Sequence, residues 1–174
     1  VSLWGDEVLP LEIAGLRAER VTFGHRVVDP GPHEVPHASA LPDLLRRQGI
    51  LADPEERRTA IRKGLDRLAR EVGGRWIEDE ELVEEVTWLV EEPTVLSGRF
   101  DPGFLDLPRE VLRTAMRSHQ RYFSVEDEGG TLLPVFLFVA HGRWDDPSSV
   151  IRWNERVLAA RLADARFYWT VDTK

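Results

Sequence analysis

A hairpin signal in the second half of this 174-residue chain constrains its fold most. The pattern predicts a strand over 121–125, a turn at Glu126-Asp-Glu-Gly-Gly130 and a second strand over 132–140. Within that second strand, Val135-Phe-Leu-Phe-Val139 is apolar on both faces, which is typical of a central, covered strand. Pro134 cannot donate a hydrogen bond to a neighbouring strand, so we expect it at the start of the strand or at a bulge.

The clearest helix begins at Asp53. Asp53 suits the N-cap position, Pro54 suits the first helical position, and Glu56 completes a capping-box pattern. Four apolar residues then recur at helical spacing: Ile61, Leu65, Leu68 and Val72. Gly73-Gly74 ends the pattern, so we predict a helix from Asp53 to that pair.

The remaining segments mix helices and strands. Further helices are predicted over 39–48 and 79–91, from Asp106-Leu-Pro108 onward, and from Asp146-Pro147 to Trp169. Strands are predicted over Val1–Trp4, 8–13, 21–28 and 94–97, with a turn at Gly5-Asp6 and a proline-rich loop over 29–36. Because regular βαβ alternation is missing, we predict an α+β fold with a mixed or antiparallel sheet and several packed helices. We expect one domain over 1–174, in which the N-terminal strands pair with the hairpin.

Charge is distributed unevenly along the chain. The net charge is −8, and residues 78–92 carry eight acidic side chains and no basic one, while the segments on either side are balanced. The helix predicted there has Leu82, Val86 and Leu89 on one stripe and the carboxylates on the other. We interpret the acidic side as a solvated face, with contact to a basic partner as the alternative.

Several classes of site are excluded or disfavoured by composition. The chain has no cysteine, which excludes disulfides, thiolate metal sites and cysteine nucleophiles. His33 and His37 have metal-ligand spacing, but Pro36 between them argues against a helix, and we predict no metal site. No glycine-rich phosphate loop is present, and no catalytic residue is assigned. The start of the chain lacks signal-peptide features and reads as the middle of a strand, which suggests an excised fragment.

The stretch Met116-Arg-Ser-His-Gln-Arg-Tyr-Phe123 lies where a helix ends and the hairpin begins. Arg117 and Arg121 could bind phosphates, Gln120 could contact a base edge, and Tyr122 could stack on a base. The structural alternative is that the basic residues favour the helix dipole while Tyr122 starts a strand.

A second polar group lies on the last predicted helix. Asn154 and Arg161 are seven residues apart, and Asp164 is placed to pair with Arg161. We predict that these three residues form an internal structural network. The aromatic run Phe167-Tyr-Trp169 covers more than one helix face, which suggests a missing neighbour.

The chain also contains an ordered series of short segments. They are Gly24-His-Arg26, Asp53 to Arg57, Glu84-Glu-Val86 with Leu89-Val-Glu91 and Pro93, Pro108 with Met116, Gln120, Tyr122 and Phe123, Leu133-Pro134, and Asn154-Glu-Arg-Val157 with Ala160 to Ala165. As an ordered set this series closely resembles the β subunit of bacterial glycyl-tRNA synthetase. The resembled family usually has lysine at the position of Arg121, and lysine is common there at the position of Arg117 and glycine at that of Trp153.

The resemblance implies a ligase of two components and an internal position for this segment in the larger one. In such an enzyme the α subunit holds ATP, Mg²⁺ and glycine, the β subunit contributes tRNA binding, and the assembly is α2β2 in the cytoplasm. The segment looks like the B3/B4 module of phenylalanyl-tRNA synthetase, which hosts an editing site in that enzyme.

Three hypotheses follow for the function. The first is a tRNA-handling or scaffolding module that supports ATP-dependent charging of glycine tRNA. Its expected RNA contacts are Arg117, His119, Gln120, Arg121 and Tyr122, with Arg26 and Arg152 as further candidates. The alternatives are hydrolytic editing of mischarged tRNA, and a structural domain that meets no RNA.

Overall fold

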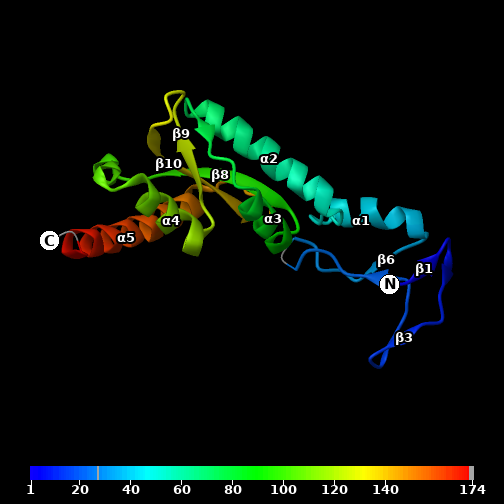
Figure 1. Cartoon of the computed structure of the whole chain (residues 1–174). Helices are drawn as coiled ribbons and strands as arrows, with labels where there is room; N and C mark the ends of the chain where they lie inside the picture. The colour runs from blue at the N-terminus through cyan, green and yellow to red at the C-terminus, as the bar shows by residue number, and fades with distance from the viewer. Residues whose placement is uncertain (27, 173–174) are drawn as a thin grey trace. The chain divides into compact units, whose positions relative to one another are not determined.

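The computed structural model of the chain describes residues 1–26 and 28–172 (Figure 1). The chain divides into two compact units, Val1–Glu56 and Arg57–Lys174. The helix α2 (Pro54–Glu71) crosses the boundary. The single domain expected over 1–174 stays a prediction.

The first unit consists of short hairpins followed by helical turns. Its elements are β1 (Leu3–Trp4), β2 (Glu7–Val8), β3 (Glu12–Ile13), β4 (Leu16–Arg17), β5 (Val21–Thr22), β6 (His33–Glu34), the 3₁₀ helix η1 (Ala38–Ala40) and α1 (Leu41–Arg47). Strands pair antiparallel as β1–β2, β3–β4 and β5–β6, and Gly5 turns the first pair with a φ of 63°. The predicted turn at Gly5-Asp6 is therefore confirmed.

Three local expectations in this unit were wrong. Of the strand predicted over 21–28, only β5 forms; residues 23–26 and 28 are not in a strand, and Val27 lies outside the described residues. The strand predicted over 8–13 is divided into β2 and β3, with Pro10 at the break, because proline has no N–H to donate to a neighbouring strand. The segment predicted as a loop over 29–36 contains the short strand β6, whose residues Glu34 and His33 lie opposite Val21 and Thr22.

The second unit is built on one four-stranded sheet. After α2 its elements are β7 (Arg75–Trp76), α3 (Glu80–Leu89), β8 (Pro93–Arg99), the 3₁₀ helix η2 (Pro102–Asp106), α4 (Arg109–Gln120), β9 (Phe123–Glu126), β10 (Leu132–His141) and α5 (Ser148–Asp172). The strand order is β7-β9-β10-β8, and every pairing is antiparallel. The fold class is α+β, as predicted. The N-terminal strands do not pair with the β9–β10 hairpin, whose outer neighbours are β7 and β8.

The central strand β10 separates two apolar cores. Leu137 points into a core shared with α2 and α3, whereas Phe136 and Phe138 point into a core shared with α4 and α5. Figure 1 shows the sheet between α2 and α5. This three-layer arrangement explains why both faces of the strand are apolar. The pairing of β10 with β9 shifts register between Leu132 and Phe136, and Pro134 lies within that interval, near the start of the strand.

The predicted capping of α2 is confirmed only in part. Oδ1 of Asp53 accepts a hydrogen bond from the backbone N–H of Glu55 at 2.8 Å. Glu56 does not close a capping box with it, because its carboxylate accepts two hydrogen bonds from Arg46. Among the described helices, none is long and apolar enough to cross a membrane.

Candidate functional site

The stretch Met116–Phe123 joins the end of α4 to the start of β9. Arg121 ends the helix in the left-handed conformation, with a φ of 56°. Its N–H donates to the carbonyl of Arg117 at 3.2 Å, and the N–H of Tyr122 donates to that of Met116 at 3.1 Å. These two bonds satisfy carbonyls that a helix end leaves free. The resulting sharp turn buries Tyr122 while the side chain of Arg121 stays partly exposed.

Both arginines of this stretch are paired with α3. Nε of Arg117 lies 2.5 Å from Oδ2 of Asp79, and its Nη2 lies 2.9 Å from a carboxylate oxygen of Glu81. Nε of Arg121 lies 2.5 Å from Oε1 of Glu85. Burial raises the pKa of Asp79, but hydrogen bonds from Arg117 and from the backbone N–H of Leu82 outweigh it, so the pKa lies below its usual value.

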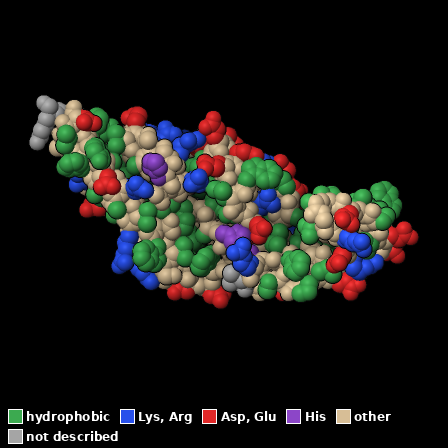
Figure 2. Space-filling view, turned by 90° about the horizontal axis from the view of Figure 1, so that it is seen from below, with side chains coloured by type: hydrophobic (Ala, Val, Ile, Leu, Met, Phe, Trp, Pro, Cys, Tyr) green, Lys and Arg blue, Asp and Glu red, His purple; other side chains and the backbone are tan. Residues whose placement is uncertain are grey.

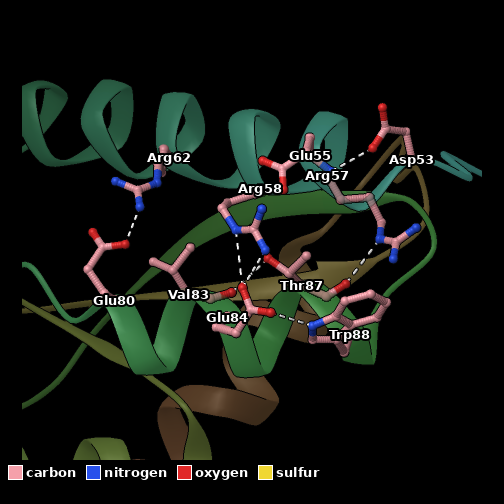
Figure 3. A network of polar contacts seen from close by, with 10 residues as sticks. All are labelled: Asp53, Glu55, Arg57, Arg58, Arg62, Glu80, Val83, Glu84, Thr87 and Trp88. Atoms are coloured by element: carbon pink, nitrogen blue, oxygen red, sulfur yellow. Dashed lines mark hydrogen bonds and ion pairs between the residues drawn. The ribbon is translucent and has the colours of Figure 1, made fainter.

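The other side of α3 is paired with arginines of α2 (Figure 3). Arg58 donates to Glu84 through Nε at 3.2 Å and also through Nη2, and Arg62 donates to Glu80. Glu84 accepts a further hydrogen bond from Nε1 of Trp88 at 2.6 Å. These carboxylates and guanidinium groups form what we call the α3 cluster: Asp79, Glu80, Glu81, Glu84 and Glu85 with Arg58, Arg62, Arg117 and Arg121.

The α3 cluster changes the interpretation of the acidic segment. Five of its eight carboxylates face arginines from two neighbouring helices, so much of its charge is balanced within the second unit. The buried stripe of α3 contains Leu82 and Val86 as predicted. Leu89 was expected on that stripe and is instead 58% exposed, because the helix ends there and the chain turns toward β8.

Tyr122 is part of the core. Its ring stacks on Phe136 with 4.5 Å between centroids, and its hydroxyl donates to Oδ1 of Asn154 at 2.6 Å. Nδ2 of Asn154 in turn donates to the carbonyl of Val150 at 2.8 Å. Burial raises the pKa of Tyr122 to about 12. The predicted internal role of Asn154 thus has a partner, and the ring of Tyr122 has little free surface for a base.

Arg161 and Asp164 were predicted to form an internal network with Asn154, but they do not take part in its contact with Tyr122. Both side chains are exposed, and they lie along a groove of about 600 Å³ between α4 and α5. His119 lines the same groove, and Gln120 is half-buried at the end of α4. The structure therefore places His119 along the same groove as Arg161 and Asp164. Those two residues of α5 lie apart from the contact between Asn154 and Tyr122.

The two remaining predicted contacts are exposed. Arg152 lies on the first turns of α5, and Arg26 lies in the first unit between β5 and β6.

The two histidines with metal-ligand spacing, His33 and His37, contact other residues. His33 contacts Asp29 at 3.2 Å, and His37 Nδ1 contacts the hydroxyl of Ser39 at 2.8 Å. Each of these histidines has a local partner of its own.

One charged site had no recognisable sequence signal. Glu126 is 7% exposed and lies between Arg75, at 2.8 Å, and Arg109, at 2.5 Å. The hydrogen bond from Arg109 holds the pKa of Glu126 below its usual value, against the opposing effect of burial. These three residues lie 17 to 51 positions apart in the sequence, so no local spacing pattern could have indicated the contact.

Comparison with known proteins agrees with the series of matching segments. The family described as glycyl-tRNA synthetase beta subunit matches residues 1–174. The chain belongs to this family. It is 51% identical over 172 residues to the glycine–tRNA ligase beta subunit of Moorella thermoacetica, covering 99% of this chain and 25% of the relative. It is 48% identical over 178 residues to that of Acidobacterium capsulatum, covering 100% and 25%.

As a member of the glycyl-tRNA synthetase beta subunit family, the chain spans about a quarter of the length of these relatives. Arg117 and Arg121 each use Nε in their ion pair with α3. A lysine has no equivalent of Nε, and its single ammonium group cannot make the forked contact of Arg117 with Asp79 and Glu81. A likeness to the B3/B4 module stays a prediction.

Proposed function

We propose that the chain is a scaffolding module of a glycine–tRNA ligase beta subunit, which supports ATP-dependent charging of tRNA with glycine. In this proposal the enzyme is a cytoplasmic α2β2 assembly, and ATP and Mg²⁺ bind the α subunit. No residue of this chain is assigned to ATP, to Mg²⁺ or to catalysis. The chain contributes a rigid three-layer unit that holds other parts of the β subunit.

One observation carries the proposal: the two arginines best suited to bind phosphate already bind carboxylates of α3. To bind RNA, Arg117 and Arg121 would have to break their ion pairs with Asp79, Glu81 and Glu85. A phosphate placed there would also approach the negative charges left behind, and like charges repel. The α3 cluster therefore favours a structural role for this end of α4.

Direct contact with tRNA is the second candidate. The exposed side chains of Arg26 and Arg152 support it, and so does the exposed side chain of His119, next to half-buried Gln120 at the end of α4. Because phosphate contacts release counterions, this candidate predicts a loss of salt dependence when the contacting arginines are removed.

The test compares tRNA binding and stability in the full-length β subunit with its α subunit. The variant Arg117→Ala plus Arg121→Ala is expected to lower the thermal midpoint and to leave the salt dependence of tRNA binding unchanged. The matched control is Arg67→Ala plus Arg70→Ala, which removes two exposed arginines of α2 outside the α3 cluster.

A different result would reverse the assignment. Two lost phosphate contacts lower the log–log salt slope by about 1.8 on a duplex. A decrease of that size in the Arg117/Arg121 variant, with an unchanged midpoint, would make this end of α4 an RNA-binding site. The same decrease in an Arg26→Ala plus Arg152→Ala variant would support the second candidate.

A further inference from the structure

The outer face of α5 carries an apolar stripe that is exposed among the residues that the structure describes. Six residues follow one another at spacings of 4, 3, 4, 3 and 4, and we call them the outer seam: Trp153, Val157, Ala160, Asp164, Phe167 and Val171. Trp153 is 65% exposed, Phe167 64% and Val171 55%. Five of the six members are apolar. Hydrophobic side chains of α5 are also visible on the surface near the C-terminal end in Figure 2.

This spacing has a definite structural meaning. Apolar residues that alternate at three and four positions form a stripe along which a second helix packs with its own stripe. The inward face of α5 already packs in the core through Leu158 and Leu162, which are fully buried. A helix that buries one face and carries a second apolar stripe on the other is typical of a middle layer, packed on both sides.

The charges beside the outer seam describe the helix that would fit it. Arg156 and Arg161 lie on its two flanks, and the guanidinium of Arg156 lies 5.8 Å from the ring centre of Trp153. Asp164 interrupts the apolar stripe at the side where the outer seam borders the groove between α4 and α5, and its side chain is exposed. A complementary helix therefore has an apolar stripe flanked by Asp or Glu, with Lys or Arg opposite Asp164.

We propose that the outer seam binds one such helix from the part of the same β subunit that lies outside these 174 residues. The chain covers only 25% of the length of its relatives, so most of the polypeptide is available to supply the helix. The exposed apolar side chains of the stripe disfavour RNA as its occupant, because RNA presents no apolar stripe to pack against them. This inference rests on the proposed scaffolding role and names the surface that performs it.

Two neighbouring alanines of α5 allow a matched test. Ala160 lies in the outer seam, whereas Ala159 points away from it by one helical step, and both are exposed in this unit. The chain contains no cysteine of its own. In the full-length β subunit we expect the thiol of Ala160→Cys to react with a maleimide at least tenfold more slowly than that of Ala159→Cys, measured on the proteolytic peptide by mass spectrometry.

Each other outcome overturns the proposal in a distinct way. Equal labelling of the two thiols means that nothing covers the seam. Protection that depends on protein concentration identifies a second copy as the occupant, protection only with the α subunit identifies that subunit, and protection only with tRNA identifies RNA. The salt series above does not depend on the seam, so failure of the scaffolding role and failure of this inference are distinguishable.

A charge in the seam provides a second readout. Ala160→Glu is expected to lower the thermal midpoint of the full-length β subunit by several degrees, because the glutamate would be buried against an apolar helix. Ala159→Glu introduces the same charge one residue away and is expected to leave the midpoint within about one degree. Equal midpoints for the two variants would contradict a covered seam.

Discussion

Arg117 of α4 binds the residue that starts α3. Its Nε lies 2.5 Å from Oδ2 of Asp79, while Oδ1 of the same carboxylate accepts the backbone N–H of Leu82 at 2.9 Å. Asp79 thus caps its own helix and ties that helix to α4. The start of one helix and the position of another depend on a single carboxylate.

Replacing Asp79 should therefore lower the free energy of unfolding more than replacing Glu81, which is more exposed. Asp79→Ala removes an N-cap, typically about 1 kcal/mol, together with a partly buried ion pair, so we expect about 1–3 kcal/mol in the free energy of unfolding. Glu81→Ala removes one exposed contact to the same arginine and should stay within about 0.5 kcal/mol. Urea titration measures both, and equal effects would contradict the capping role.

The contact of Glu126 with Arg109 predicts a dependence of stability on pH. A carboxylate whose pKa is lowered in the folded state adds stability above its ordinary pKa, and that stability is lost as the pH falls through the lowered value. Glu126→Gln should be less stable than the unmodified chain at pH 7, and the difference should shrink below about pH 4. Urea midpoints across pH test this.

Glu128→Gln serves as the matched control for Glu126→Gln, because it lies in the same hairpin and its side chain is exposed. It should change the midpoint little at any pH. A constant difference between Glu126→Gln and the unmodified chain from pH 7 to pH 3 would mean that the charge of Glu126 has no part in the effect.

The hydroxyl of Tyr122 and the amide of Asn154 should be energetically coupled. Tyr122→Phe leaves Oδ1 of Asn154 without its donor at 2.6 Å, and we expect a loss of about 0.5–1.5 kcal/mol. In the double variant Tyr122→Phe with Asn154→Ala, the loss should be smaller than the sum of the single losses. Strict additivity in denaturant titrations would show that this hydrogen bond contributes nothing.

Gly64→Ala is expected to destabilise the second unit, although helix propensity favours alanine over glycine. Alanine in place of glycine inside a helix usually gains about 1 kcal/mol. At this position a Cβ would come within 2.9 Å of the Cβ of Val95 on β8 and closer still to its Cγ2, and overpacking of a core costs about 1–3 kcal/mol. Gly64→Ala should therefore lower the thermal midpoint, and Val95→Ala in the same chain should reverse part of that effect. A raised midpoint for Gly64→Ala alone would contradict this close approach of α2 to the sheet.

The local elements of the second unit could be predicted from the sequence because their signals lie within a few residues. Asp53-Pro54 marks the start of α2, and Gly73-Gly74 follows its end. The β9–β10 hairpin, its central strand and the position of Pro134 near the start of that strand followed from alternation and from the missing N–H of proline. Capping, turn chemistry and periodicity act over short distances along the chain, so they are visible in the order of residues.

The tertiary structure alone decided what those elements do with their charges and apolar faces. Arg117 and Asp79 are 38 positions apart, and nothing local distinguishes an arginine that will bind a carboxylate from one that will bind a phosphate. The same holds for α5, where the sequence indicated a missing neighbour near Phe167 but not which face was already buried. Helix position and side-chain pairing depend on how layers pack around β10, and that packing involves contacts between residues far apart in the chain.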